Sequence, residues 1–182
     1  MKIIVIRSNL KEGLSIIARA IGGDGKLPIL KNVLFEVGEN KIKLTATNLE
    51  FATTRVLPGK VIEKGSAAVN FSVLANIVNN LQDERLNLEK KGDTVELVSD
   101  NYRASLNCSP GEDFPVIPQI KNTEEPLEIK ADVLRGALLE VLAATQASEL
   151  RPELNSILFD FSLDSLRLVG TDSFRLAEKT IK

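Results

Sequence analysis

The 182-residue sequence contains no histidine, no tryptophan and only one cysteine. The absence of histidine excludes histidine-based acid–base catalysis and histidine metal ligation. The single cysteine, Cys108, excludes an intrachain disulfide and a Cys-x-x-Cys site, which indicates a reducing compartment. Cys108 lies in a strand-like run, where burial as a small apolar residue is favoured over reactivity. The sequence therefore predicts no catalytic set, no metal site and no cofactor.

Long apolar runs and a strong net charge are also missing. The opening residues, MKIIVIRSNLKEG, hold too short an apolar run for a signal peptide, and no stretch approaches a membrane span. We therefore expect a cytoplasmic protein without a membrane partner. The 23 basic and 25 acidic side chains give a formal net charge of -2. This balance argues against coating nucleic acid by bulk charge, but it leaves room for a local basic face.

One glycine-rich loop invites a nucleotide-binding interpretation. Residues 22–26 read GGDGK, but Ala20 and Leu27 stand where a Walker phosphate loop needs glycine and Ser or Thr. The loop also follows a predicted helix and precedes a strand, which is the reverse of the order that a phosphate loop requires. The pattern favours a turn at a helix C-terminus.

The most informative feature that is present is an internal repeat. Residues 30–53 (LKNVLFEVGENKIKLTATNLEFAT) align without a gap with residues 154–177 (LNSILFDFSLDSLRLVGTDSFRLA), at an offset of 154 − 30 = 124 positions. Upstream, residues 6–10 resemble 129–133 at an offset of 123, which predicts a one-residue gap. The period has the length of a small domain, so it indicates domain duplication rather than a solenoid. Chance likeness between two amphipathic hairpins is the alternative.

Hydrophobic periodicity predicts three β-α-β-β-β units. The first has a strand at 2–7, a helix capped by Ser8 or Asn9, and strands at 31–38, 41–47 and 50–57. The second has a strand at 67–71, a helix capped by Ser72, and strands at 86–90, 94–99 and 102–108. The third has a strand at 128–130, a helix capped by Asp132, and strands near 155–162, 165–171 and 174–181. Residues 109–126 hold four prolines and are interpreted as a linker. An odd number of units predicts a missing fourth.

Four segments, in order, carry a resemblance to a known family. They are Leu27-Pro28-Ile29-Leu30 with Asn32-Val33-Leu34-Phe35, then 44–50 (LTATNLE), then 111–115 (GEDFP), then 171–177 (TDSFRLA). Together they resemble the bacterial DNA polymerase III beta subunit, the sliding clamp. The resemblance covers the whole chain. Phe174 stands where the family frequently has histidine, and Asp24 where some members have arginine.

The resemblance implies an α+β, DNA-clamp fold of repeated β-α-β-β-β units, with helices on one face of antiparallel sheets. It implies an N-terminal clamp domain at 1–120, a linker at 121–126 and the first half of the middle domain at 127–182. A family member is about twice this long, so a fragment is expected. The full-length form is implied to be a ring-shaped homodimer that encircles duplex DNA and tethers the replicative polymerase. The polymerase and the clamp loader are implied to bind through short peptides.

The resemblance also implies sites. DNA-binding residues are expected at Lys11, Arg19, Lys26, Arg135 and Arg151. The half of the partner-peptide pocket on this chain is expected at Leu154, Thr171, Ser173, Phe174, Arg175 and Leu176. A dimer interface is expected at Ile77 and Leu81. Taken without the resemblance, the sequence pattern favours ordinary core positions for Leu154 and Leu176 and solvated surface charges for Arg175 and the helix cations.

Two function classes remain open. The first is a non-enzymatic processivity clamp, an accessory subunit of a DNA-directed DNA polymerase. The second is a clamp-like scaffold that binds partner peptides without encircling DNA. A small-molecule enzyme on an α+β fold is poorly supported because no catalytic set exists.

Overall fold

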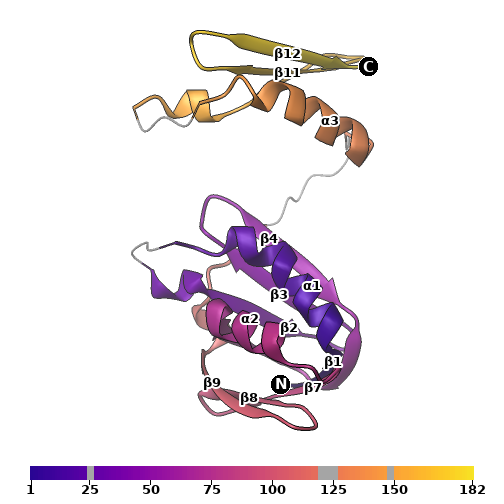
Figure 1. Ribbon diagram of the computed structural model, residues 1–182, viewed down its shortest axis with the longest axis vertical. Coiled ribbons are helices and arrows are strands. Elements are labelled where there is room, and N and C mark those ends of the chain that lie inside the picture. Colours follow the sequence, from indigo (N-terminus) through magenta and orange to yellow (C-terminus); the bar gives the residue numbers. More distant parts are fainter. Residues whose placement is uncertain (24–26, 119–126, 147–149) are drawn as a thin grey trace. The chain divides into compact units, whose positions relative to one another are not determined.

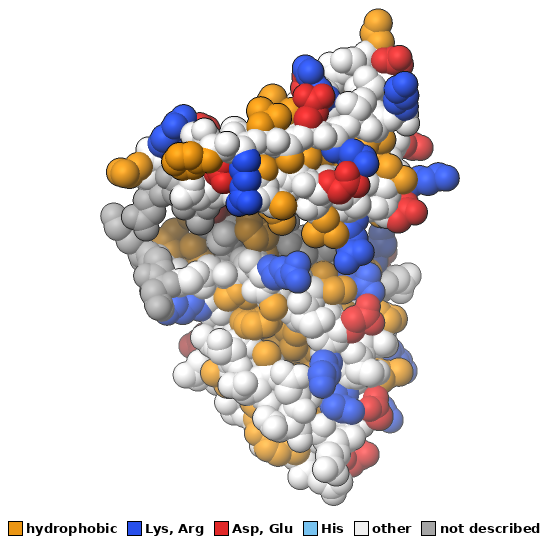
Figure 2. All heavy atoms as spheres, turned by 45° about the horizontal axis from the view of Figure 1, so that its top comes forward, with side chains coloured by type: hydrophobic (Ala, Val, Ile, Leu, Met, Phe, Trp, Pro, Cys, Tyr) orange, Lys and Arg blue, Asp and Glu red, His pale blue; other side chains and the backbone are white. Residues whose placement is uncertain are grey.

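A computed structural model describes residues 1–23, 27–118, 127–146 and 150–182, which form two compact units, Met1–Gln119 and Ile120–Lys182 (Figure 1). We call these unit 1 and unit 2. Asp24, Lys26 and the predicted linker 121–126 lie outside the described residues. No helix in the described part of the chain is long and apolar enough to cross a bilayer. Charges of both signs are interspersed on the face drawn in Figure 2, in keeping with the near-zero net charge.

Unit 1 consists of two β-α-β-β-β halves. The first half comprises β1 (Lys2–Ile6), α1 (Arg7–Ile17), β2 (Asn32–Val37), β3 (Ile42–Thr47) and β4 (Ala52–Leu57). The second comprises β6 (Gly65–Asn70), α2 (Phe71–Asn80), β7 (Arg85–Lys91), β8 (Thr94–Val98) and β9 (Arg103–Ser109). Short 3-10 helices lie at Ala18–Ala20, Pro28–Lys31 and Gly111–Asp113. The predicted element order is thus confirmed for both halves.

The two halves of unit 1 exchange their first strands. β1 pairs antiparallel with β7 of the second half, and β6 pairs antiparallel with β2 of the first half. The sheet order is β4-β3-β2-β6-β9-β8-β7-β1-β5. Exchanging β1 with β6 and β2 with β7 maps the one pairing onto the other, so the halves are related by an approximate two-fold axis. Neither half is complete without the other.

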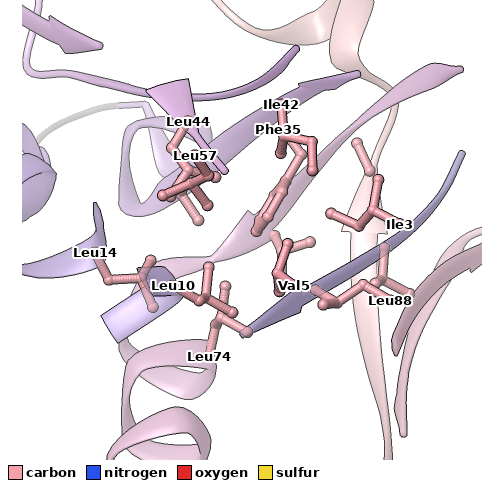
Figure 3. Close-up of a cluster of buried hydrophobic side chains, with 14 of the residues drawn as sticks. Ile3, Val5, Leu10, Leu14, Phe35, Ile42, Leu44, Leu57, Leu74 and Leu88 are labelled. Carbon is pink, nitrogen blue, oxygen red and sulfur yellow. The ribbon is translucent and has the colours of Figure 1, made fainter. Parts of the chain in front are cut away.

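The core of unit 1 lies between the sheet and the two helices. α1 buries Leu10, Leu14 and Ile17 at helical spacing, and α2 buries Leu74 and Val78. They meet alternate side chains of the strands, among them Val5, Phe35 and Leu44, which are almost wholly buried (Figure 3). This alternation fixes the register, because a slip of one residue would turn each strand's apolar side to solvent.

Unit 2 repeats the first half of unit 1 at a constant offset of 124. It comprises α3 (Ala131–Leu142), a 3-10 helix at Pro152–Asn155, β10 (Leu158–Phe161), β11 (Leu166–Thr171) and β12 (Leu176–Ile181). The 3-10 helices, β3 with β11, and β4 with β12 all match at 124. The predicted offset of 123 in the helix is wrong. Leu10, Gly13, Leu14 and Ile17 of α1 correspond at 124 to Leu134, Ala137, Leu138 and Val141, the core-facing side of α3.

The structure corrects the predicted start of each helix. α1 begins at Arg7, whose backbone N–H donates to the Glu84 carbonyl at 2.7 Å, so neither Ser8 nor Asn9 caps it. α2 is capped by Asn70 instead of Ser72: the Asn70 side chain accepts from the Val73 N–H at 3.1 Å. α3 begins at Ala131, which places Asp132 in its first turn.

Three segments also differ from the predicted elements. β5 (Gly59–Glu63), which pairs with β1, was not predicted, because Pro58 reads as the end of a strand. Residues 128–130 form no strand. Residues 110–118 are part of unit 1 and not a free linker, since Phe114 is buried against Leu34 and Ala68.

Candidate functional site

The turn between β11 and β12 holds five of the six predicted pocket residues. The Thr171 hydroxyl donates to the Arg175 carbonyl at 2.7 Å and accepts from the Ser173 N–H at 3.2 Å. Asp172 Oδ1 accepts from the N–H groups of Phe174 and Arg175 at 3.0 and 2.8 Å. Ser173 has φ 76°, a left-handed conformation that these bonds support. The turn is therefore fixed by its own polar side chains.

Unit 1 contains the same turn 124 residues earlier. The Thr47 hydroxyl donates to the Phe51 carbonyl at 2.9 Å and accepts from the Leu49 N–H at 3.0 Å. Asn48 Oδ1 accepts from the N–H groups of Glu50 and Phe51, both at 3.0 Å. Leu49 has φ 74°. The Thr-Asx pair is thus needed for the turn in both repeats, while the side chains that the turn presents differ.

Hydrogen bonds and an ion pair fix the Asp172 carboxylate at the turn in unit 2. The N–H of Arg175 is the main cause that lowers the pKa of Asp172, with further hydrogen bonds from the Phe174 N–H and the Arg175 side chain. Arg175 Nε lies 2.9 Å from Asp172 Oδ2. Asp172 is therefore a carboxylate at neutral pH, and it orients Arg175.

The predicted pocket side chains differ greatly in exposure. Phe174 is 94% exposed and Leu176 65% exposed, whereas Leu154 is buried at 7%. Arg151 joins the 3-10 helix that carries Leu154 to the turn: its Nη1 donates to Ser173 Oγ at 3.0 Å and its Nε to Glu153 Oε1 at 2.9 Å. The structure thus brings the Leu154 segment beside Ser173, with Phe174 as an exposed apolar side chain of the turn.

Arg151 was predicted to bind DNA, and its contacts place it instead at the edge of the candidate pocket. The repeat gives no signal for this contact, because Arg151 and Ser173 correspond at 124 to the apolar residues Leu27 and Leu49. Arg151 remains a predicted DNA-binding residue that no observation tests.

The other described DNA-binding candidates lie on helical surfaces. Lys11 on α1, Arg19 in the 3-10 helix after it and Arg135 on α3 are all exposed. Within the described residues, no ion pair involves any of the three. At the structural offset of 124, Lys11 and Arg135 are equivalent positions. The two repeats therefore present an unpaired cation at equivalent positions of α1 and α3.

Ile77 and Leu81, the predicted dimer-interface residues, are half-buried and pack against the core of unit 1. With Asn76, Asn80 and Tyr102 they line a hollow of about 280 Å³ at the C-terminal end of α2. Because both side chains pack against the core, their apolar character does not by itself indicate an interface, and that role stays a prediction.

A family model, curated relatives and solved structures all point to the same family. The family model of the DNA polymerase III beta subunit, N-terminal domain, matches residues 1–118. The "Beta sliding clamp" of Vibrio cholerae is 32% identical over 179 residues, which is 97% of this chain and 49% of the relative. That of Escherichia coli K12 is 30% identical over 183 residues, with 97% and 49% coverage. The chain thus spans about half the length of the curated relatives it matches.

Solved structures agree with the fold. The DNA polymerase III subunit beta of Pseudomonas aeruginosa superimposes with a TM-score of 0.92 at 26% identity, covering 100% of this chain and 50% of that one. A sliding clamp from Bartonella birtlesii bound to griselimycin gives 0.87 at 29% identity, with the same coverage. The predicted α+β, DNA-clamp fold, with its repeated β-α-β-β-β units, is confirmed.

Proposed function

Because the chain belongs to the DNA polymerase III beta-subunit family, we propose that it provides the N-terminal domain and half of the next domain of a DNA sliding clamp. In this role it is a non-enzymatic accessory subunit in the cytoplasm. The ring-shaped homodimer of the full-length form encircles duplex DNA. The replicative polymerase and the clamp loader bind through short peptides.

The proposal that the chain contacts DNA is supported by the equivalence of Lys11 and Arg135. A clamp has to touch phosphates without reading sequence, and a cation repeated on equivalent helices supplies such contacts. Arg19, in the 3-10 helix that follows α1, adds a further exposed cation to unit 1. Few cations and a balanced total charge favour contacts weak enough for the protein to slide, since each phosphate contact adds a salt-dependent increment to affinity.

The proposal that partner peptides bind this chain is supported by the turn at 171–176. Phe174 and Leu176 supply exposed apolar surface, which is what a short apolar peptide needs. Arg175, oriented by Asp172, can hold a carbonyl or carboxylate of that peptide. A rigid turn limits the entropy lost when the peptide binds, because its backbone is already ordered.

The DNA part is tested by fluorescence anisotropy with two labelled duplexes of unrelated sequence, titrated with the purified chain over a series of salt concentrations. We expect weak binding that is equal for both duplexes and falls with salt. Lys11→Ala and Arg135→Ala should each reduce the slope of log affinity against log salt by about 0.9, as loss of one phosphate contact does.

Lys64→Ala is the matched control, because Lys64 is already paired with Glu39 at 2.6 Å. It should leave the slope unchanged. Sequence preference, or binding that persists at high salt, would contradict the proposal. Peptide binding without any DNA binding would support the clamp-like scaffold instead.

A further inference from the structure

The first strand of unit 1 is apolar on both of its faces. Within β1, Ile3 and Val5 point into the core, where both are almost wholly buried (Figure 3). Ile4 and Ile6 project from the opposite face of the sheet, because successive side chains of a strand alternate. A strand with one solvated face usually carries polar side chains on that face. Ile6 is nevertheless 52% exposed, so β1 has an outer apolar surface that the core does not explain.

This apolar surface is the floor of a hollow of about 420 Å³, within the size range of small-ligand sites. Its lining comes from β1, β5, the start of β7 and the first turn of α1, and it is mainly apolar, with Ile4, Ile6 and Pro58 as side chains of the floor. All of these elements belong to unit 1, in which both β-α-β-β-β halves are present.

Two cations flank the hollow from the neighbouring strands. Lys60 on β5 lies opposite Ile4, and Arg85 on β7 lies opposite Ile6. Opposed residues of antiparallel strands project from the same face of a sheet, so both cations stand beside the apolar floor. Both are exposed, and among the described residues neither takes part in an ion pair or a side-chain hydrogen bond.

Glu84, the acidic residue among the lining residues, is already paired. Arg7 Nη2 donates to Glu84 Oε1 at 2.9 Å, and the Arg7 side chain is only 22% exposed. The charge of Glu84 is therefore balanced by Arg7, which leaves the charges of Lys60 and Arg85 uncompensated. An apolar floor between two such cations complements an apolar group that has an acidic group on either side.

The positions of the two cations set the spacing of those acidic groups. Lys60 and Arg85 lie on either side of β1, opposite residues that are two apart along it. Neighbouring strands lie about 4.8 Å apart and a strand rises about 3.3 Å per residue, so the two Cα atoms are about 12 Å apart. In an extended peptide this is close to the distance between residues i and i+4, and residues i, i+2 and i+4 project to the same side.

We propose that this hollow of unit 1 binds an extended peptide segment of a partner protein with the pattern acidic-x-apolar-x-acidic. The apolar side chain covers Ile4 and Ile6, and the acidic side chains reach Lys60 and Arg85. A fatty acid has one anionic group and would leave one cation unmatched, and duplex DNA has no apolar side chain to cover the floor. The site uses none of the residues proposed above for DNA or partner-peptide binding, so its failure would leave the proposed function unchanged.

Nuclear magnetic resonance titration of the isotope-labelled whole chain tests the proposal, because amide shifts both locate a weak site and give its affinity. The probe is the peptide acetyl-Gly-Glu-Ser-Leu-Ser-Glu-Gly-amide, added up to about 1 mM. We expect the amide resonances of residues 4–6, 59–60 and 84–85 to shift as peptide is added. A matched peptide with Gln in place of both Glu residues should bind about fivefold more weakly or worse, because two ion pairs are lost.

Variants of the protein test each contact. Lys60→Gln and Arg85→Gln should each weaken binding about two- to fivefold, as expected for the loss of one exposed ion pair. Ile6→Ser removes an apolar contact and should weaken binding about five- to tenfold. Arg103→Gln, which removes an exposed cation from β9 of the same unit, is the control and should bind the peptide like the wild type.

The spectrum of each variant without peptide shows whether it is folded, and the comparison of the two peptides uses the wild-type chain alone. Absence of shifts, shifts confined to other parts of the chain, or equal binding of the Glu and Gln peptides would overturn the proposal. Unchanged affinity in a folded Ile6→Ser protein would also overturn it. The same holds if dodecanoate or a DNA duplex binds at these residues more tightly than the peptide does.

Discussion

Replacing Phe35 with alanine should severely destabilise unit 1, because this side chain is fully buried at the centre of the exchanged sheet. Phe35 lies opposite Leu44 on β3 and opposite Ala67 on β6, so it joins the two halves. A Phe→Ala change in a core costs about 3–5 kcal/mol, a large part of the roughly 5–15 kcal/mol that holds a domain together. With a urea dependence of about 2 kcal/mol per molar, the unfolding midpoint should fall by about 2 M.

The single tyrosine makes this measurement specific to unit 1. Tyr102 lies in unit 1, so tyrosine fluorescence during urea unfolding reports that unit without a signal from unit 2. Phe51→Ala is the matched control in the same unit. Phe51 is 47% exposed, and its loss should cost only about 1 kcal/mol. Equal midpoint shifts for the two variants would refute the assignment of Phe35 to the centre of the core.

Two further predictions concern unit 2. Gly170→Ala would place a Cβ 2.6 Å from the Val141 carbonyl oxygen and should lower the free energy of unfolding by about 1–3 kcal/mol. Gly136→Ala, in open space on α3, should instead raise it by up to about 1 kcal/mol. Thermal melts followed by circular dichroism measure both, and the reverse order of stability would contradict the prediction. Hydrogen bonds lower the pKa of Asp172 in the folded state, so its stabilising effect is complete above the ordinary carboxyl pKa and is lost only as pH falls through the lowered pKa. The amide resonances of Phe174 and Arg175 should therefore stay constant from about pH 5 to 8. A titration of these resonances in that range would be incompatible with the turn.

Much of the fold could be predicted from periodicity, because β1, β7 and β8 alternate between buried and more exposed residues. β2, β3 and β4 lie within one or two residues of the predicted ranges. The start of α1 could not be predicted, since it depends on a distant part of the chain. Arg7 finds its hydrogen-bond partner in Glu84, which no local cap signal reveals. The predicted strand at 128–130 does not form, because a strand needs a partner and the described part of unit 2 provides none.

The candidate site was predictable in part. The likeness of Thr47-Asn48 to Thr171-Asp172 is visible in the sequence, and it correctly marks equivalent positions with the same turn. The contact from Arg151 to Ser173 was not visible, because it depends on where the 3-10 helix meets the turn. Arg135 and Lys11 could be placed on similar helix faces from the sequence, but the assumed one-residue gap kept them from being aligned as equivalent positions.

The most direct test of the central claim is a titration of a labelled tail peptide from a bacterial replicative polymerase into the wild-type chain and the Phe174→Ala variant. Phe174 is 94% exposed, so its removal should leave the fold intact, and we expect peptide binding to weaken by about 1–3 kcal/mol. Leu163→Ala, an equally exposed change at the opposite end of the same sheet, should have no effect. Unchanged affinity in a folded Phe174→Ala protein would contradict the account and remove this turn from the partner site.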